Sequence, residues 1–376
     1  MDLSRYVIHG VWPARAERPT TTEALADTIH AAHDAREAIV LWGGGTRIAI
    51  GEPPARYDIA VDLSELRGIV EHSPADLVCT VRAGTTLAEL SATLARHGQR
   101  WPVDVAYPER ATVGGTIASA APSASRLRHQ HVRDWIIGCE AVLGDGTRAR
   151  AGGRVVKNVT GYDLTRLYSG TYGTLAALAE VSLKLVAVDE VTVTLSMRDD
   201  PAPLRDLALR LRAALPLDAI VLAIGAPAGG GAALHVRIAG ASATVARMRR
   251  EVEATGTFTV DAGDAIGALA RGVVDSTHIA RLATAPGHEA DELSPALIAY
   301  IGTGTAYLGG ATERLRALRA SAEADGGALV LERATLDQKR ALGVWGTPRM
   351  PAAIAASLKR RFDPRDVLAP GRMPVT

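Results

Sequence analysis

The sequence predicts an α+β fold made of two domains, and three observations support this prediction. The chain has 376 residues, which is long for one domain and comfortable for two. In the first half, short strand-like apolar runs alternate with helices and glycine-rich turns. In the second half, strands and helices recur in two rounds, in the order of a ferredoxin-like α+β domain. These elements include strands expected at residues 219–224 and 328–333, a helix at 312–324 and a helix near 292–300. We therefore expect domains at residues 1–188 and 189–345, with residues 346–376 returning to the first.

Composition excludes several classes of protein. Hydrophobic residues make up 47% and charged residues 22% of the chain, as in ordinary globular proteins. The net charge is only +1, whereas a nucleic-acid-binding protein usually carries a basic excess. The first residues lack the pattern of a secretory signal, and no apolar run reaches the length of a membrane-spanning helix. We expect a cytoplasmic protein, associated with a membrane only at its periphery through a complex. Cys79 and Cys139 lie in strand-like runs and are expected to be inert buried thiols.

The first helix is expected to begin at Thr20–Glu23, where hydroxyl groups and an early acid suit a helix N-terminus. His30 and His33 are spaced i, i+3 on this helix, so a metal pair is conceivable. A packed or solvated helix face is favoured, because no third ligand is near in the sequence. The helix leads into a strand at residues 39–42.

This strand ends in the first glycine element, Gly43-Gly44-Gly45-Thr46-Arg47. Successive backbone N–H groups in such a turn form an anion-binding concavity suited to a pyrophosphate. Thr46 adds a hydroxyl donor, and Arg47 can make a charge-assisted bond to a phosphate oxygen. The motif is neither a Walker loop nor a spaced GxGxxG, so an ordinary glycine-rich turn remains the alternative.

Further strands are predicted in the first half, and a helix is predicted from Leu87 to about His97. The strands are expected at residues 58–62, 68–72 and 77–81. Gly98 is a natural residue to end the helix.

The second glycine element covers residues 112–120, in which small residues dominate. A helix that begins with Gly114-Gly115 can come very close to a ligand, and its free N–H groups favour a phosphate or an electron-rich ring edge. The alternative is a small-residue helix that simply packs tightly.

Three more stretches of the first half carry polar groups or turn signals. Residues 125–134 are dense in arginine and histidine; near a ligand they would bind a carboxylate or an anionic ring, and on a surface they would only be solvated. The Asp-Gly pair at 145–146 predicts a hairpin. In the third glycine element, residues 152–164, Lys157 stands among glycines in a chain rich in arginine, which indicates a specific polar role.

The order of these motifs resembles the FAD-binding domain of the para-cresol methylhydroxylase and vanillyl-alcohol oxidase superfamily. Six motifs follow one another over about residues 20–187: GGGT, VRAGTTLAEL, ATVGGTIASA, VRDWIIGCEAVLGDG, GGRVVKNVTGYDL and EVSLKL. Residues 362–373 resemble the closing motif of the same family. Within the superfamily, the chain most resembles the glycolate oxidase FAD-binding subunit.

The resemblance implies a two-lobed α+β fold with FAD extended between the lobes, followed by a ferredoxin-like cap domain. Relatives with covalent flavin often carry a histidine in the first glycine loop, which has none here, so FAD is expected to be non-covalent. The cofactor-binding residues implied by the resemblance are Gly43, Gly44, Gly45, Thr46, Arg47, Thr112, Gly114, Gly115, Ser119, Gly173, Thr174 and Glu180.

The resemblance also implies partners, namely a larger FAD-bearing subunit and an iron–sulfur subunit, and a small 2-hydroxy acid as substrate. No general base can be named, because the HGDGN motif of the large catalytic relatives is missing. His235, His278 and His288 stand alone and are expected to be packed or solvated. Two alternatives remain open: a stand-alone FAD-dependent alcohol or hydroxy-acid oxidoreductase, and a non-enzymatic assembly subunit with a degenerate flavin site.

Overall fold

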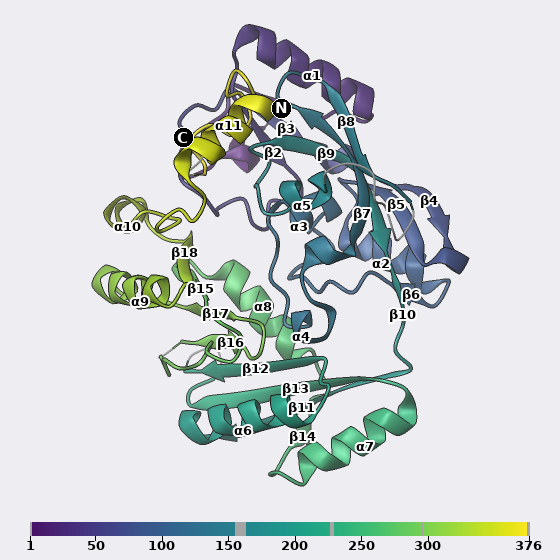
Figure 1. Cartoon of the computed structure of the whole chain (residues 1–376), viewed down its shortest axis with the longest axis vertical. Coiled ribbons are helices and arrows are strands. Elements are labelled where there is room, and N and C mark those ends of the chain that lie inside the picture. The colour runs from purple at the N-terminus through teal and green to yellow at the C-terminus, as the bar shows by residue number, and fades with distance from the viewer. Residues whose placement is uncertain (1, 155–162, 226–228, 295, 374–376) are drawn as a thin grey trace. The chain divides into compact units, whose positions relative to one another are not determined.

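The computed structural model describes residues 2–154, 163–225, 229–294 and 296–373. The third glycine element, with Lys157, therefore lies largely outside the described residues. The chain divides into two compact units. Unit 1 comprises residues 1–121, 131–187 and 348–376, and unit 2 comprises residues 122–130 and 188–347. Figure 1 labels the helices and strands of both units.

The first lobe of unit 1 is a three-stranded parallel sheet with the order β1-β3-β2. Its strands are β1 (Arg15–Glu17), β2 (Ile39–Trp42) and β3 (Ile59–Asp62). Helix α1 (Thr22–Ala35) connects β1 to β2 and buries Leu25, Ile29 and Ala32. The Thr21 hydroxyl accepts a hydrogen bond from the N–H of Ala24 at 3.1 Å, which confirms the predicted hydroxyl cap.

The second lobe of unit 1 is a five-stranded antiparallel sheet with the order β4-β5-β9-β7-β8. Its strands are β4 (Ile69–Ser73), β5 (Val78–Arg82), β7 (Ile136–Leu143), β8 (Arg148–Gly152) and β9 (Ala176–Lys184). The predicted Asp-Gly hairpin joins β7 to β8. A short antiparallel pair, β6 (Gln99–Arg100) and β10 (Val186–Ala187), completes the strands described in this unit.

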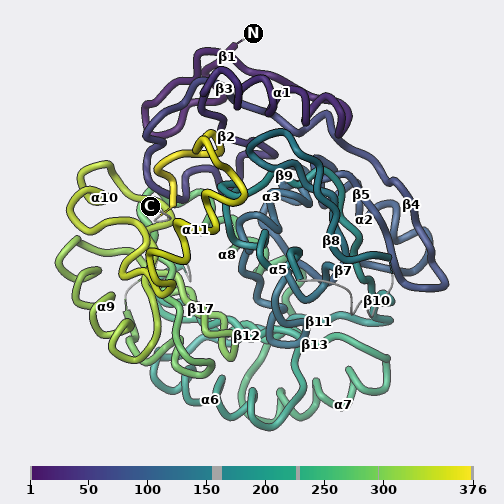
Figure 2. The backbone as a smooth tube through the Cα atoms, turned by 45° about the horizontal axis from the view of Figure 1, so that its top comes forward, coloured from purple at the N-terminus to yellow at the C-terminus, as the bar shows by residue number. Residues whose placement is uncertain are grey.

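Helices α2 (Leu87–Ala95) and α3 (Val113–Ala118) contribute to the apolar core of the second lobe. The other helices of unit 1 are α5 (Leu164–Tyr168) and the C-terminal α11 (Ala352–Phe362). The C-terminal segment returns to the first lobe, where Val367–Ala369 runs parallel to the start of β2. In Figures 1 and 2 this yellow segment lies beside the purple β2.

Unit 2 is built on one antiparallel sheet of eight strands with the order β14-β11-β13-β12-β16-β17-β15-β18. The strands of the first half are β11 (Val191–Asp199), β12 (Ala219–Ile224), β13 (Ala232–Gly240) and β14 (Thr259–Val260). Those of the second half are β15 (Ile279–Ala283), β16 (Ile298–Tyr300), β17 (Thr305–Leu308) and β18 (Ala328–Arg333). The helices are α4 (Arg126–His129), α6 (Pro201–Ala214), α7 (Ser242–Glu253), α8 (Ala265–Asp275), α9 (Thr312–Ala324) and α10 (Leu336–Leu342).

This sheet consists of two ferredoxin-like repeats joined edge to edge. The elements β11-α6-β12-β13-α7-β14 form a complete β-α-β-β-α-β unit, and its strands have the order 4-1-3-2 within the sheet. In the second repeat, β15, β16, β17 and β18 take the same order in the opposite direction. The two repeats meet where β12 pairs with β16. The predicted ferredoxin-like domain is thus confirmed, as a fused pair of repeats.

One element of the second repeat was predicted wrongly. A helix was expected near residues 292–300, but residues 298–300 form strand β16. The run Leu297–Ile301 is buried and pairs with β12 on one side and β17 on the other, so strand pairing determines its conformation. Among the described residues, no helix is long and apolar enough to cross a membrane.

Candidate cofactor site

The first glycine element lies directly after β2 and packs closely against the chain that leads into α3. A Cβ atom on Gly44 would overlap the backbone carbonyl oxygen of Arg110, and one on Gly43 would overlap the hydroxyl of Thr112. Gly45 has a φ of +72°, which favours glycine. These glycines therefore bring the first and second glycine elements into direct contact.

The turn leaves backbone donors available for a ligand. Within the part of the chain that the structure describes, the N–H groups of Gly44 and Gly45 donate to no protein acceptor. The carbonyl of Gly45 accepts from the N–H of Ile48 at 3.4 Å, so the turn closes on its carbonyl side. Adjacent unpaired amides on a glycine turn are donors suited to an anion such as a phosphate group.

The second glycine element differs from its prediction in one respect. The N–H groups at the start of α3 were expected to be free, but the N–H of Val113 donates to the carbonyl of Thr85 at 2.9 Å and that of Gly114 to the carbonyl of Ala83 at 2.8 Å. The N–H of Gly115 donates to the hydroxyl of Thr112 at 3.2 Å. The helix start is thus capped by its own chain, because the end of β5 packs against it.

The same helix keeps a small exposed surface. Gly115 is exposed, whereas Gly114 is buried against Ala83. The hydroxyl of Ser119 donates back to the carbonyl of Gly115 at 2.7 Å and so stays within the helix. The available contact surface of α3 is therefore backbone and a glycine hydrogen, with no long side chain.

The loop at residues 170–174 lies against α3 of the second glycine element and against β2, the strand that leads into the first. The N–H of Tyr172 donates to the carbonyl of Ala118 in α3 at 2.8 Å, and Gly173 (φ +74°) packs against Leu41 of β2. The hydroxyl of Thr174 donates to the carbonyl of Thr171 at 2.8 Å. Of the predicted residues, Gly43 to Arg47, Thr112, Gly114, Gly115, Ser119, Gly173 and Thr174 are therefore brought together by these packed elements.

Glu180 lies apart from them in the contacts that the structure describes. It is in β9, opposite Arg82 and Glu140 on the neighbouring strands, and its carboxylate is 4.0 Å from the Arg82 guanidinium. No hydrogen bond or ion pair among the described residues joins Glu180 to the glycine turn.

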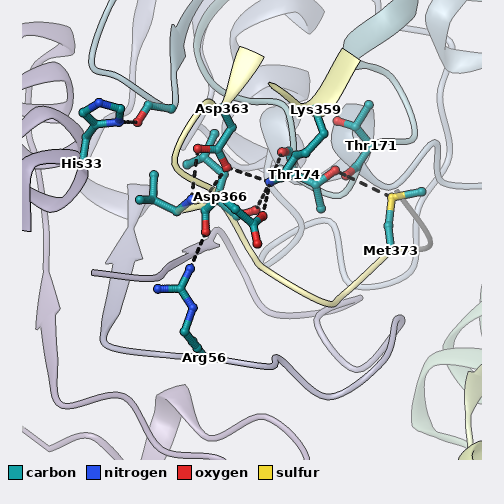
Figure 3. A network of polar contacts seen from close by, with 11 residues as sticks. His33, Arg56, Thr171, Thr174, Lys359, Asp363, Asp366 and Met373 are labelled. Carbon is teal, nitrogen blue, oxygen red and sulfur yellow. Dashed lines mark hydrogen bonds and ion pairs between the residues drawn. The ribbon is translucent and has the colours of Figure 1, made fainter. Parts of the chain in front are cut away.

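The sequence prediction missed two residues of the C-terminal segment that contact these loops. Lys359 is buried in α11, and its ammonium donates to the carbonyl of Thr174 at 2.9 Å (Figure 3). Arg372 is also buried, and it donates to the carbonyl of Ile48 at 2.6 Å and to that of Ile50. Burial lowers the pKa of Arg372 to about 10. Arg372 belongs to the closing motif, which was a visible signal, whereas Lys359 precedes that motif.

Residues 13–152 match the family model described as "FAD binding domain". The chain carries an FAD-binding domain. The glycine turn, whose Gly44 and Gly45 N–H groups have no acceptor among the described residues, fits the pyrophosphate of this cofactor.

Curated relatives of the FAD-binding domain include subunits of glycolate oxidase. The chain is 35% identical to "Glycolate oxidase subunit GlcE" of Escherichia coli over 175 residues, which are 46% of this chain and 49% of that protein. It is 31% identical to "Glycolate oxidase subunit GlcD" of Bacillus subtilis over 47% of this chain and 38% of that protein. It is 31% identical to "D-lactate dehydrogenase" of Archaeoglobus fulgidus over 45% of this chain and 38% of that protein. The matches thus span less than half the length of these relatives and confirm the resemblance seen in the motifs.

The fold extends beyond the matched sequence. A solved structure of alkyldihydroxyacetonephosphate synthase aligns with a TM-score of 0.67 over 94% of this chain and 75% of that chain, at 14% identity. The likeness therefore includes unit 2 as well as the FAD-binding domain, and it concerns the fold alone. The two-lobed FAD-binding fold of the para-cresol methylhydroxylase type is thus confirmed.

The cationic stretch at residues 125–134 is divided between the units, and its first part is held by carboxylates of unit 2. Arg128 lies 3.0 Å from the carboxylate of Asp189, and His129 lies 3.4 Å from that of Asp218. Burial opposes ionisation of Asp218, but its bonds to His129 and Arg237 lower its pKa. Arg128 and His129 thus differ from both predicted alternatives, because they pair with carboxylates of the protein, whereas His131 and Arg133 are exposed as the surface alternative expects.

The two histidines of the conceivable metal pair, and one of the histidines that stand alone in the sequence, contact groups of the protein itself. His30 and His33 contact the backbone carbonyls of Asp145 at 3.0 Å and Gly144 at 3.1 Å, so these two residues anchor α1 to the β7–β8 hairpin. His235 contacts the hydroxyl of Ser196 at 2.8 Å, and burial lowers its pKa. None of these contacts assigns a general base.

Proposed function

We propose that this chain is a non-covalent FAD-binding subunit of a glycolate oxidase-like complex that oxidises 2-hydroxy acids. The observation that carries the proposal is the glycine turn, where the N–H groups of Gly44 and Gly45 have no protein acceptor among the described residues. The similarity of the surrounding 175 residues to a glycolate oxidase subunit supports the reaction class.

In this proposal the pyrophosphate of FAD lies on the backbone of Gly43 to Arg47. The cofactor then runs along Thr112, Gly114, Gly115 and Ser119, and the loop of Gly173 and Thr174 closes the site together with Glu180. The exposed Gly115 supports this path, because it offers backbone without a side chain. The turn contains neither histidine nor cysteine, which supports non-covalent binding.

When bound, FAD would supply the hydride acceptor for the oxidation of a 2-hydroxy acid. The residues described here bind and orient the cofactor, and no side chain is assigned to remove the hydroxyl proton. We therefore favour an accessory role beside a larger FAD-bearing subunit and an iron–sulfur subunit. Residues 1–188 and 346–376 would form the FAD-binding part, and residues 189–345 the cap.

Absorption spectroscopy of the purified protein tests cofactor binding. A flavin spectrum, with the flavin released on denaturation, is expected. Replacement of Arg47 by methionine should weaken FAD binding by about 1.5–3 kcal/mol, the value of one charge-assisted hydrogen bond. Gly44 is a poor choice for this test, because any Cβ there would overlap the Arg110 carbonyl and disturb the fold itself. A colourless protein that does not take up added FAD would contradict the proposal and favour an assembly role.

Anaerobic mixing with glycolate or D-lactate separates the two enzymatic alternatives. The similarity to a D-lactate dehydrogenase favours the stand-alone enzyme as second candidate. An accessory subunit should keep its oxidised flavin spectrum with either acid until the partner subunits are added. Direct bleaching by this chain alone would establish the second candidate.

A further inference from the structure

We infer that Lys359 and Arg372 are positioning residues for FAD, and that each holds one loop of the cofactor site through backbone carbonyl groups. The inference rests on the proposed FAD site, since it assigns a role to residues that contact the loops of that site. Both residues lie outside residues 13–152, which the FAD-binding family model covers. They belong to the C-terminal segment, defined here as residues 359–373.

Lys359 fixes the loop at residues 170–174. Its ammonium donates to the carbonyl of Thr174 at 2.9 Å, to the carbonyl of Leu368 at 2.8 Å and to the carboxylate of Asp363 at 2.7 Å (Figure 3). The carboxylate of Asp366 lies 3.1 Å from the same ammonium, so four acceptors surround the three N–H donors of the lysine. Thr174 directly follows Gly173, so the lysine determines where this loop ends.

Asp363 connects the same network to β2. Its carboxylate accepts from the N–H of Val367 at 3.0 Å and from that of Leu368 at 2.7 Å. Residues 367–369, held in this orientation, pair with Ile39 at the start of β2. The N–H of Ile39 donates to the carbonyl of Val367 at 2.7 Å, and the carbonyl of Ile39 accepts from the N–H of Ala369 at 2.7 Å. Because β2 runs from Ile39 directly into the glycine turn, the network also sets the position of that turn.

Arg372 fixes the other end of the glycine loop. Its guanidinium donates to the carbonyls of Ile48 and Ile50, which follow Arg47 in the sequence. Its own carbonyl accepts from the N–H of Glu52 at 3.3 Å. The loop is thus attached at its start through β2 and at its end through Arg372.

These attachments link FAD binding to the order of the C-terminal segment. A ligand that orders both loops must stabilise the C-terminal segment that holds them. By the same coupling free energy, loss of the segment's contacts must weaken binding of the ligand. A purely structural role would change the stability of the protein without this reciprocity.

The first experiment measures the dissociation constant of FAD for the full-length apoprotein, well below its unfolding temperature. The substitutions Lys359→Met and Arg372→Met are each expected to raise this dissociation constant about tenfold or more, which is within the usual range of coupling between sites. The double variant Lys359→Met/Asp363→Asn removes the buried charge that would be left without its lysine, but it also removes one of the two oxygens that accept from the N–H groups of Val367 and Leu368, so it should show at least the same loss. The matched control is Arg365→Met, in the same segment, because Arg365 donates to the carbonyl of His33 at 2.8 Å and to the neighbouring Asp34. The control should keep the wild-type dissociation constant even if its melting temperature falls.

The second experiment measures hydrogen exchange of the amides of residues 367–369 with and without FAD. FAD should slow their exchange in the wild-type protein and should have little effect in Lys359→Met. Wild-type affinity in the folded Lys359 and Arg372 variants, or no effect of bound FAD on these amides, would overturn the inference while leaving FAD binding intact. Failure of the wild-type protein to bind FAD would instead overturn the proposed function, and the inference with it.

Discussion

At the scale of single residues, small groups determine the candidate site. Gly43 and Gly44 are required because the chain at residues 110–112 occupies the space of their missing side chains. Gly115 has a different status, since it is exposed and a Cβ there would meet only the Thr112 hydroxyl, at 2.9 Å. A sequence shows only that glycines are present, and packing decides which of them serve the fold and which are open to a ligand.

Gly115→Ala tests whether FAD passes close to α3. Alanine favours the helical conformation over glycine by about 1 kcal/mol, but its methyl group would come within 2.9 Å of the Thr112 hydroxyl that caps the helix. Because these two effects oppose each other, the thermal stability of the apoprotein should stay close to that of wild type. The dissociation constant of FAD should nevertheless rise, because the added methyl group occupies the surface on which the cofactor would lie. Unchanged affinity would place the cofactor away from this residue.

The two cysteines provide a test that depends on pH. Burial raises the pKa of Cys79 to about 11 and that of Cys139 to about 12. Neither thiol should react with a thiol reagent at pH 8 in the folded protein, and both should react in denaturant. Because the folded pKa values exceed the unfolded value of about 8.5, their contribution to stability is present below that pH and is lost as the pH rises towards the folded values. Rapid labelling of the native protein at pH 8 would contradict this assignment.

At the scale of elements, clear periodicity and capping were enough to predict most of the fold. Strands β12 and β18 and helix α9 have the bounds expected from the sequence, because each combines a steady apolar pattern with clear ends. Helix α8 was missed although Ile266, Leu269 and Val273 lie on one buried face, since Gly267 and Gly272 lower its helix propensity. The sequence predicts a helix at β16 because only pairing with the distant β12, and with the following β17, identifies this run as a strand. Long-range pairing is the information that a local pattern lacks.

The capping box of α2 is an element whose stability can be tested directly. The Thr86 hydroxyl accepts from the N–H of Glu89 at 3.2 Å, and the Glu89 carboxylate accepts from the N–H of Thr86 at 3.0 Å. Thr86→Ala should lower the free energy of unfolding by about 1 kcal/mol. Ser91→Ala, at an exposed position in the interior of the same helix, is the control and should have little effect or a small stabilising one. Equal effects of the two substitutions in denaturant titrations would show that the cap contributes nothing specific.

At the scale of the whole molecule, the order of the chain does not follow the division into units. The chain enters unit 2 at residues 122–130, returns to unit 1, and enters unit 2 again at residue 188. Within unit 2, the early segment is held by Asp218, whose carboxylate lies 3.4 Å from His129 and 2.6 Å from Arg237. Ala124 adds an apolar contact to the core formed with α8. This insertion could not be predicted from the sequence, because a short basic stretch has no periodic pattern and its acidic partner lies far along the chain.

Asp218→Asn tests whether this early segment is an integral part of unit 2. The substitution removes a nearly buried negative charge and leaves the cations around it unbalanced, so it should destabilise unit 2 by about 3 kcal/mol. Asp206→Asn, at an exposed position on α6, is the control and should change stability little. The pKa of Asp218 is lowered, so its stabilising effect should be present above the unfolded pKa of about 3.9 and should be lost as the pH falls through the lower folded value. Hydrogen exchange of residues 122–130 and of strand β12 should therefore accelerate together in Asp218→Asn, while exchange in β7 and β9 of unit 1 stays as in wild type. Acceleration confined to residues 122–130 would show instead that the segment only rests on unit 2 and that the fused repeats are stable without it.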